Sequence, residues 1–92
     1  MKVSGRQISA ARDLLGLTQV ELAKAAGVGE STVLNFELGK LEPHQRNREK
    51  IQTELERRGI EFTNGDGIGV RLNNAKAAEY AKSVAQARPE TR

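Results

Sequence analysis

Four glycines divide the first sixty residues of the chain into short segments, and their spacing limits the length of the helices that the chain can form. Gly16, Gly27, Gly39 and Gly59 each follow a stretch in which apolar residues recur three or four positions apart, as on one face of an amphipathic helix. Glycine commonly occupies the left-handed position after a helix, so each is expected to end one. The predicted helices span residues 4–15, 19–26, 30–38 and 43–58.

The second and third of these helices carry the most specific local signals. Thr18 and Glu21 form a T-x-x-E capping box, in which each side chain accepts a hydrogen bond from the backbone N–H of the other residue. After Gly27, Val28 supplies an apolar contact across the turn. Ala23 is small enough to let the next helix approach closely. Two short helices joined in this way are expected to cross at a steep angle, with the second protruding from the domain.

The pattern changes after Gly59. Ile60 and Phe62 alternate with polar residues, residues 64–67 supply Asn-Gly-Asp-Gly turn chemistry, and Val70 and Leu72 continue the alternation. This predicts a β-hairpin over residues 60–72. Residues 73–92 contain few bulky apolar groups and are expected to form a flexible or weakly helical tail. The fold class is therefore mostly α, with a helical domain at 1–59 followed by the hairpin and the tail.

Composition argues against several classes of function. The chain has no cysteine and one histidine, His44, so we expect neither a disulfide nor a metal site. It has only two aspartates and no glycine-rich phosphate loop after a strand, so we expect no enzyme activity and no cofactor. No apolar stretch approaches the roughly 18 residues of a membrane span, so we expect a cytoplasmic protein without a membrane partner. The net charge of +3 suits a polyanionic partner but does not establish one.

Residues 17–40, LTQVELAKAAGVGESTVLNFELGK, resemble the helix-turn-helix of phage repressors and other Xre-type regulators. The agreement covers ten positions, namely Thr18, Gln19, Leu22, Ala23, Gly27, Val28, Val33, Phe36, Glu37 and Gly39. The resemblance implies a four-helix, lambda-repressor-like helix-turn-helix domain, followed here by a C-terminal β-hairpin. It also implies double-stranded DNA as the partner, with the helix at 30–38 in the major groove.

The exposed side chains at the start of that helix are the candidate base contacts, Glu30, Ser31, Leu34 and Asn35. Asn35 can pair with adenine through two hydrogen bonds, Glu30 can accept from a cytosine amino group, and Leu34 can contact a thymine methyl. Two other interpretations remain open. Glu30 can instead interact only with the helix dipole, and Asn35 can be a solvated side chain without a contact.

The resemblance also suggests phosphate contacts and one ion pair. The candidate phosphate contacts are Gln19, Lys24, Lys40, Arg46 and Arg48, and for the charged ones simple solvation is the alternative. Gln19 is the residue that clamps a phosphate or a neighbouring base-contacting side chain in such proteins, and the alternative is an ordinary residue at a helix N-terminus. Arg12 and Glu37 resemble the pair that ties the first helix to the third. Gly29 departs from the family pattern, because serine or threonine usually caps the third helix there.

These features predict a sequence-specific transcriptional regulator that represses as a homodimer on a two-fold symmetric operator. Ile60, Phe62, Val70 and Leu72 form an apolar face that the fourth helix cannot readily cover, so we expect it to be the dimer interface. The alternative is a monomer whose hairpin folds back on its own helices. The alternative function is that of an antitoxin or anti-activator that mainly binds another protein.

Overall fold

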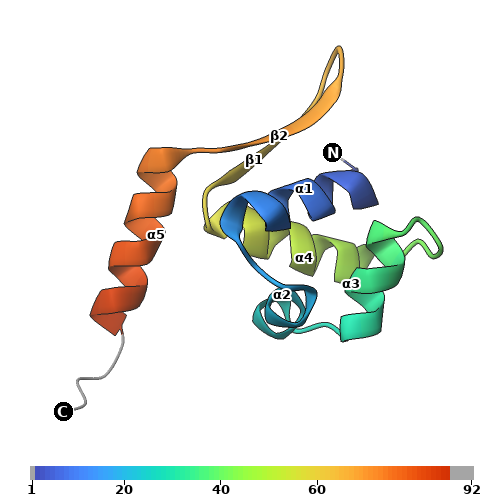
Figure 1. The fold of residues 1–92 in the computed structure, drawn as a ribbon, viewed down its shortest axis with the longest axis horizontal. Helices are drawn as coiled ribbons and strands as arrows, with labels where there is room; N and C mark the ends of the chain where they lie inside the picture. The colour runs from blue at the N-terminus through green and yellow to red at the C-terminus, as the bar shows by residue number, and fades with distance from the viewer. Residues whose placement is uncertain (1, 88–92) are drawn as a thin grey trace.

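The computed structural model describes residues 2–87 as a helical bundle with a hairpin and a further helix after it (Figure 1). The first four helices are α1 (Gly5–Leu15), α2 (Gln19–Ala26), α3 (Glu30–Glu37) and α4 (Gln45–Arg57). They are followed by β1 (Ile60–Asn64), β2 (Ile68–Leu72) and α5 (Asn74–Ala87). The mostly α fold with a hairpin after four helices is confirmed.

Local signals set the helix boundaries. Thr18 and Glu21 form the predicted capping box at the start of α2, and Ser4 and Gln7 form a second one at the start of α1. Gly16 and Gly27 end these helices in the left-handed conformation, with φ of 70° and 76°. In this region the backbone of any residue with a Cβ would be strained, which explains why glycine stops each helix.

The fourth helix begins later than predicted. Pro43 does not open it; the chain remains extended through His44, the N-cap, and α4 starts at Gln45. Pro43 is buried in the loop between α3 and α4, so it packs against the bundle and does not form the first helical turn. The α3 helix ends at Glu37, one residue before the predicted boundary, and Leu38 is its C-cap.

The core is built from apolar side chains of the first four helices and β1, together with Val3 just before α1, and β2 packs against it with the half-buried Val70 and Leu72. Its members are Val3, Ile8, Ala11, Leu22, Ala23, Val33, Phe36, Ile51, Leu55, Ile60 and Phe62. Where α1 meets α3, the packing is so close that the backbones touch: a Cβ added at Gly5 would lie 2.0 Å from the carbonyl oxygen of Phe36. Gly5 therefore permits an approach that no other residue would allow.

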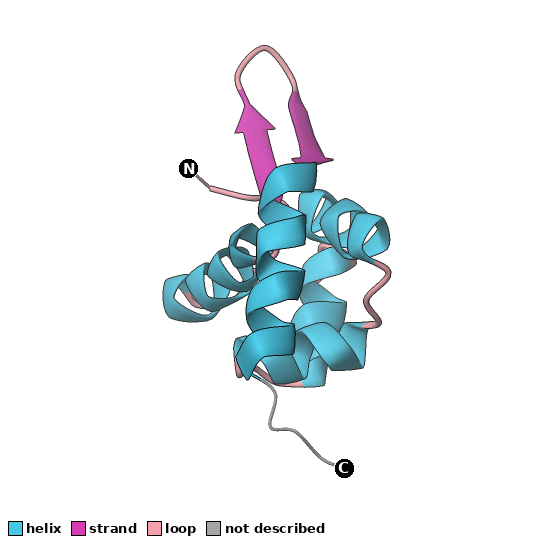
Figure 2. Ribbon diagram, turned by 90° about the vertical axis from the view of Figure 1, so that its left-hand side faces the viewer, coloured by secondary structure: helices cyan, strands magenta, loops and turns pink. Residues whose placement is uncertain are grey.

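The hairpin packs on the helices, so its apolar face is largely covered within a single copy of the chain. The strands pair in antiparallel register, with Ile60 opposite Leu72 and Phe62 opposite Val70. Figure 2 shows the hairpin extending beyond the helices. Helix α1 lies against β2, and α4 leads directly into β1. As a result Ile60 and Phe62 are only 2% and 7% exposed, while Val70 and Leu72 are half-buried against the same core. The expectation that this apolar face stays uncovered is wrong, because α1 and not only α4 covers it.

Gln7 fastens the hairpin to the bundle. A glutamine is ordinarily expected to face solvent, but Gln7 lies four residues before Ala11 on the inner face of α1, and its side chain is buried. Its Nε2 donates towards Thr63 O at 3.0 Å, Asn64 Oδ1 at 2.8 Å and Gly69 O at 3.0 Å, and its Oε1 accepts from the backbone N–H of Ser4. One side chain thus holds both strands to the start of α1.

The α5 helix stands to one side of the bundle (Figure 1). Its first turn is fixed, because Asn73 Oδ1 accepts from the N–H of Lys76, and Gly59 lies so close to Ala77 that a Cβ would be 2.9 Å from the Ala77 nitrogen. Further along, the ring of Tyr80 lies under the guanidinium groups of Arg57 and Arg58, about 5 Å from each. Residues 74–87 of the predicted tail are therefore helical, and residues 88–92 lie outside the described part of the chain.

Candidate nucleic-acid interface

Helices α2 and α3 form a rigid pair joined by a tight turn. Leu22 and Ala23 of α2 and Val33 of α3 are buried where the helices meet. The N–H of Val28 donates to Ala23 O at 3.0 Å, which closes the turn after Gly27. A small residue at position 23 allows the close approach that the sequence predicts, and α3 lies at the edge of the bundle (Figure 1).

In the part of the chain that the structure describes, no other element covers the outer face of α3. Val33 and Phe36 point into the core, so the residues on the opposite side of the helix face solvent. Of the four candidate base contacts, Glu30, Ser31 and Leu34 are exposed and Asn35 is half-buried. Gly29 provides no side-chain cap, as its identity predicts, so the first turn of α3 keeps backbone N–H groups without a side-chain partner.

Arg12, Glu37 and Gln19 form a hydrogen-bonded network behind α3. Arg12 donates to both carboxylate oxygens of Glu37, at 2.9 and 3.0 Å, and to Leu17 O at 2.9 Å. The Glu37 side chain is only 5% exposed. The hydrogen bond with Glu37 raises the pKa of Arg12 above its ordinary value, so this guanidinium stays charged. This ion pair joins α1 to the end of α3, and it is a scaffold contact.

Gln19, at the start of α2, belongs to the same network. Its Nε2 donates to Glu37 Oε1 at 3.0 Å, which fixes the direction of the side chain. An amide nitrogen carries two N–H groups, so one remains to donate outward. The hydrogen bond to Glu37 therefore fixes the orientation of the Gln19 side chain, and Gln19 links the first turn of α2 to the last turn of α3.

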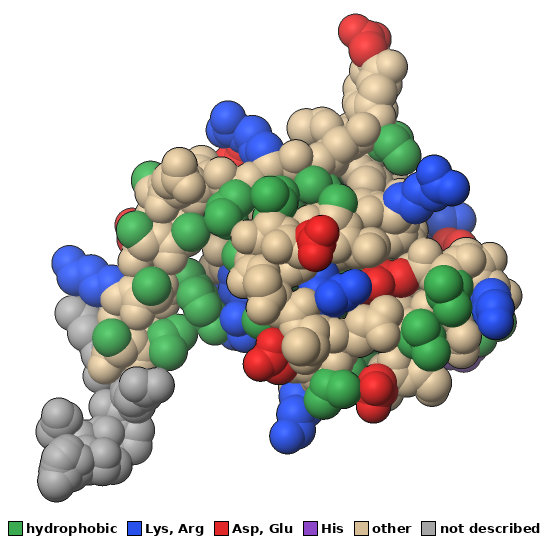
Figure 3. Space-filling model, in the orientation of Figure 1, with side chains coloured by type: hydrophobic (Ala, Val, Ile, Leu, Met, Phe, Trp, Pro, Cys, Tyr) green, Lys and Arg blue, Asp and Glu red, His purple; other side chains and the backbone are tan. Residues whose placement is uncertain are grey.

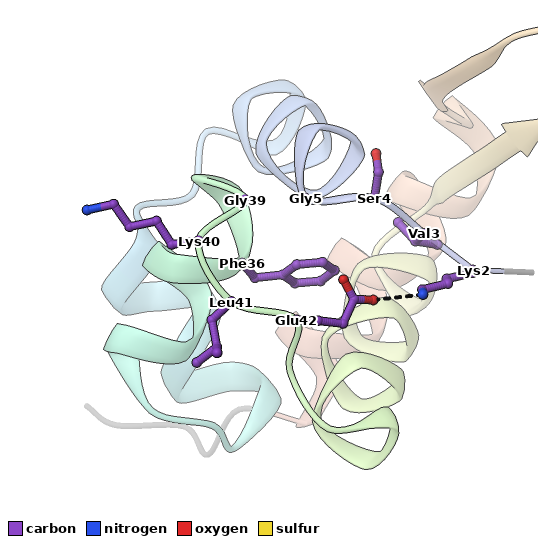
Figure 4. A pocket seen from close by; sticks show the side chains of 9 residues that line it. All are labelled: Lys2, Val3, Ser4, Gly5, Phe36, Gly39, Lys40, Leu41 and Glu42. Atoms are coloured by element: carbon purple, nitrogen blue, oxygen red, sulfur yellow. Dashed lines mark ion pairs between the residues drawn. The ribbon is translucent and has the colours of Figure 1, made fainter.

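The candidate phosphate contacts differ in whether their side chains are exposed to solvent or engaged with other residues of the protein. Lys24, Lys40 and Arg46 are exposed, on α2, on the loop after α3 and on α4. Figure 4 shows Lys40 extending away from the hollow beneath its loop. A flexible lysine in this position can reach an anion beside α3 without losing an internal partner.

The model of the helix-turn-helix family matches residues 8–58, from the first turns of α1 to the residue after α4. This is more than half of the chain. The protein belongs to the helix-turn-helix family. More narrowly it is an Xre-type, lambda-repressor-like member, as residues 17–40 predicted, and so a DNA-binding regulator. A comparison with curated proteins found no match.

Within this helix-turn-helix domain, Arg48 is less available than the sequence suggests. Its side chain is mostly buried, donates to Pro43 O at 3.3 Å and lies 3.5 Å from a carboxylate oxygen of Glu42. It therefore braces the loop before α4. Charge pattern alone could not show this, because an arginine that supports a loop and one that faces DNA look the same in sequence.

Sequence reasoning missed Leu38. This residue is well exposed at the end of α3, seven positions after Ser31 and four after Leu34, so it shares the outer face with both. The helical spacing could have found it, but leucine is usually assigned to a core.

Other features of the helix-turn-helix protein do not suggest a ligand site. In residues 2–87, no group of three or more His, Asp or Glu side chains is placed to hold a metal ion, and no helix is long and apolar enough to cross a membrane. The hollow in Figure 4 has a volume of about 370 Å³, and the Lys2–Glu42 ion pair, 3.1 Å long, crosses it.

Proposed function

We propose that this protein represses transcription as a homodimer that binds a two-fold symmetric operator, with α3 of each copy in the major groove. The observation that carries the proposal is the division of α3 into two faces. Its inner face is fixed by Val33, Phe36 and the Glu37 network, whereas Glu30, Ser31, Leu34 and Asn35 are directed outward. A rigidly held helix whose outer face is exposed is what recognition of base edges requires.

Specificity and positioning fall to different residues. Asn35 pairs with adenine, and Glu30 accepts from a cytosine amino group at the start of the helix. Gln19, Lys24, Lys40 and Arg46 contact phosphates and set the position of α3 along the duplex. Arg48 is left out of this set because its guanidinium is engaged with Glu42 and Pro43.

Pairing of two copies follows from the small footprint of one α3. A single recognition helix covers few base pairs, and two half-sites about one helical turn apart give the discrimination that one cannot. Because the apolar face of the hairpin is covered, pairing uses the strand edges instead. Within residues 2–87, each strand of the two-stranded sheet has one edge without a neighbouring strand, and edge-to-edge pairing of two hairpins would form a four-stranded sheet.

The test begins with selection of binding sites from a pool of random duplexes, using the full chain. Asn35→Ala should lose roughly 1–3 kcal/mol at one operator position and accept other bases there. Asn74→Ala, an exposed asparagine at the start of α5, is the matched control and should bind as the wild type does. A reporter placed under the selected site should be repressed by the wild type.

Three outcomes would count against the proposal. Absence of any sequence preference at moderate salt would favour the protein-binding alternative. Equal weakening of Asn35→Ala on specific and random DNA would assign this residue to positioning. A monomer in sedimentation, both free and on the selected site, would remove the dimer.

A further inference from the structure

The outer face of α3 carries two leucines that the fold does not use. Leu34 and Leu38 are 40% and 58% exposed, and they lie one turn apart on the side of the helix opposite Val33 and Phe36. Figure 3 shows hydrophobic side chains exposed beside charged ones over α3 and the loop after it. Neither leucine supports the core, so the strip that they form is available to a partner.

The chemistry of α3 narrows what that partner can be. Residues 30–38 include no lysine or arginine, and the groups that can hydrogen-bond on the exposed side, Glu30, Ser31 and Asn35, precede Leu38. The exposed side of the helix is therefore polar at its start and apolar at its end. In the major groove the apolar group that distinguishes one base pair from another is the C5-methyl of thymine.

We infer that Leu34 and Leu38 recognise thymine methyl groups, so that the part of each half-site under the end of α3 consists of A·T pairs. The inference rests on the proposed function. Asn35, next to Leu34, favours the same composition, since its side chain pairs best with adenine and the partner of adenine carries the methyl group.

Lys40 supports this placement. It follows Leu38 by two residues and projects from the loop after α3 (Figure 4). A phosphate contact there would hold the end of α3 against the groove floor, where the leucines can exclude water from the methyl groups. Each methyl group buried in this way should strengthen binding about fourfold.

The experiment uses the full chain and its selected site. Each thymine in the site is replaced, one at a time, by deoxyuracil, which keeps every hydrogen-bonding group and lacks only the methyl. The wild type should bind about fourfold more weakly at one or two positions under the end of α3. In Leu34→Ala and Leu38→Ala the difference between thymine and uracil should disappear, each at its own position.

Leu14→Ala is the matched control, because Leu14 is also an exposed leucine (50%) but lies on α1. It should keep the full difference between thymine and uracil. The substitutions in the DNA leave the protein unchanged, so the test does not depend on how any variant folds.

The outcomes separate the two proposals. If the chain selects a site but binds its thymine and uracil forms equally, the leucine inference is wrong and the proposed function stands. If Leu34→Ala or Leu38→Ala abolishes self-association while the thymine-to-uracil difference remains, the strip is a protein contact, which also overturns the inference. If no site is selected, the proposed function itself fails.

Discussion

Replacing Gln7 by glutamate tests how strongly one buried amide holds the hairpin to the bundle. The change is isosteric, but it exchanges the Nε2 donor for an oxygen. That atom would then face three oxygens that now lie 2.8–3.0 Å from the nitrogen: Thr63 O, Gly69 O and Asn64 Oδ1. The packing volume stays constant, so the effect reports hydrogen bonding and charge alone.

The size of the stability loss depends on which of these three acceptors can find another hydrogen-bond donor. The Asn64 amide can rotate and present its nitrogen, at the expense of its present bond to Lys2 O. The two backbone carbonyls cannot turn away, so each loses the hydrogen bond from Gln7, at about 0.5–1.5 kcal/mol apiece. Adding the buried charge, we expect Gln7→Glu to lose roughly 3–5 kcal/mol at neutral pH. This is a large share of the stability of a small domain, about 5–15 kcal/mol.

The pH dependence gives a second readout. Burial among oxygens should raise the pKa of the introduced carboxyl above its value in the unfolded chain. A raised pKa in the folded state means that stability is recovered as the pH falls and lost as the pH rises through that value. A protonated carboxyl also regains one donor. The variant should therefore approach the wild type in acid.

Urea unfolding followed by circular dichroism measures both effects. The control is Gln45→Glu, the same change on an exposed side chain, whose present partner is Glu49. It should change stability by no more than about 0.5 kcal/mol. A loss below about 1 kcal/mol for Gln7→Glu, or a pH profile parallel to that of the control, would refute the role of the amide.

Three further expectations follow from the contacts. Glu37→Ala should lower the free energy of unfolding by about 2–4 kcal/mol in thermal or urea denaturation, because Arg12 loses its partner in a mostly buried site; an unchanged melting temperature would contradict this. Gly5→Ala should cost at least about 2 kcal/mol in urea unfolding, since its Cβ would collide with the backbone of α3, and a neutral result would mean that α1 can move away freely. The hydrogen bond from Arg71 lowers the pKa of Glu61 below 4.5, so this carboxylate stabilises the fold above its unfolded pKa and the benefit is lost as the pH falls through its folded value. Glu61→Gln should accordingly be less stable than the wild type at neutral pH and equal to it in strong acid, as measured by unfolding at both pH values.

The helix boundaries could be predicted because their causes are local. The capping box of Thr18 and Glu21 and the left-handed glycines at 16 and 27 act within a few residues, so the sequence pattern contains everything that decides them. Pro43 shows the limit of such reasoning. It looks like the first residue of a helix, but it packs into the bundle, and tertiary contacts shift the start of α4 to Gln45.

The hairpin could not be placed from pattern alone. The alternation of Ile60 and Phe62 shows that one face is apolar, but it does not show which element covers that face. Gln7 fixes the position of the hairpin through contacts some sixty positions away in sequence, and its residue type, not its place in the helical period, suggests a solvated side chain. A pattern method treats a glutamine as solvated unless its partners are known.

The buried polar groups have one property in common that bears on recognition. Gln7 joins α1 to the hairpin, and Glu37 joins α1 and α2 to α3. Glu54 holds the two arginines at the end of α4, Arg57 and Arg58, which stack on Tyr80 of α5. Packing among aliphatic side chains is non-directional and tolerates small rotations of one helix on another. Hydrogen bonds of fixed geometry do not, so they determine the angle at which each element sits. For α3 this means that the direction of its outer face depends on Glu37, a residue that never needs to contact the DNA.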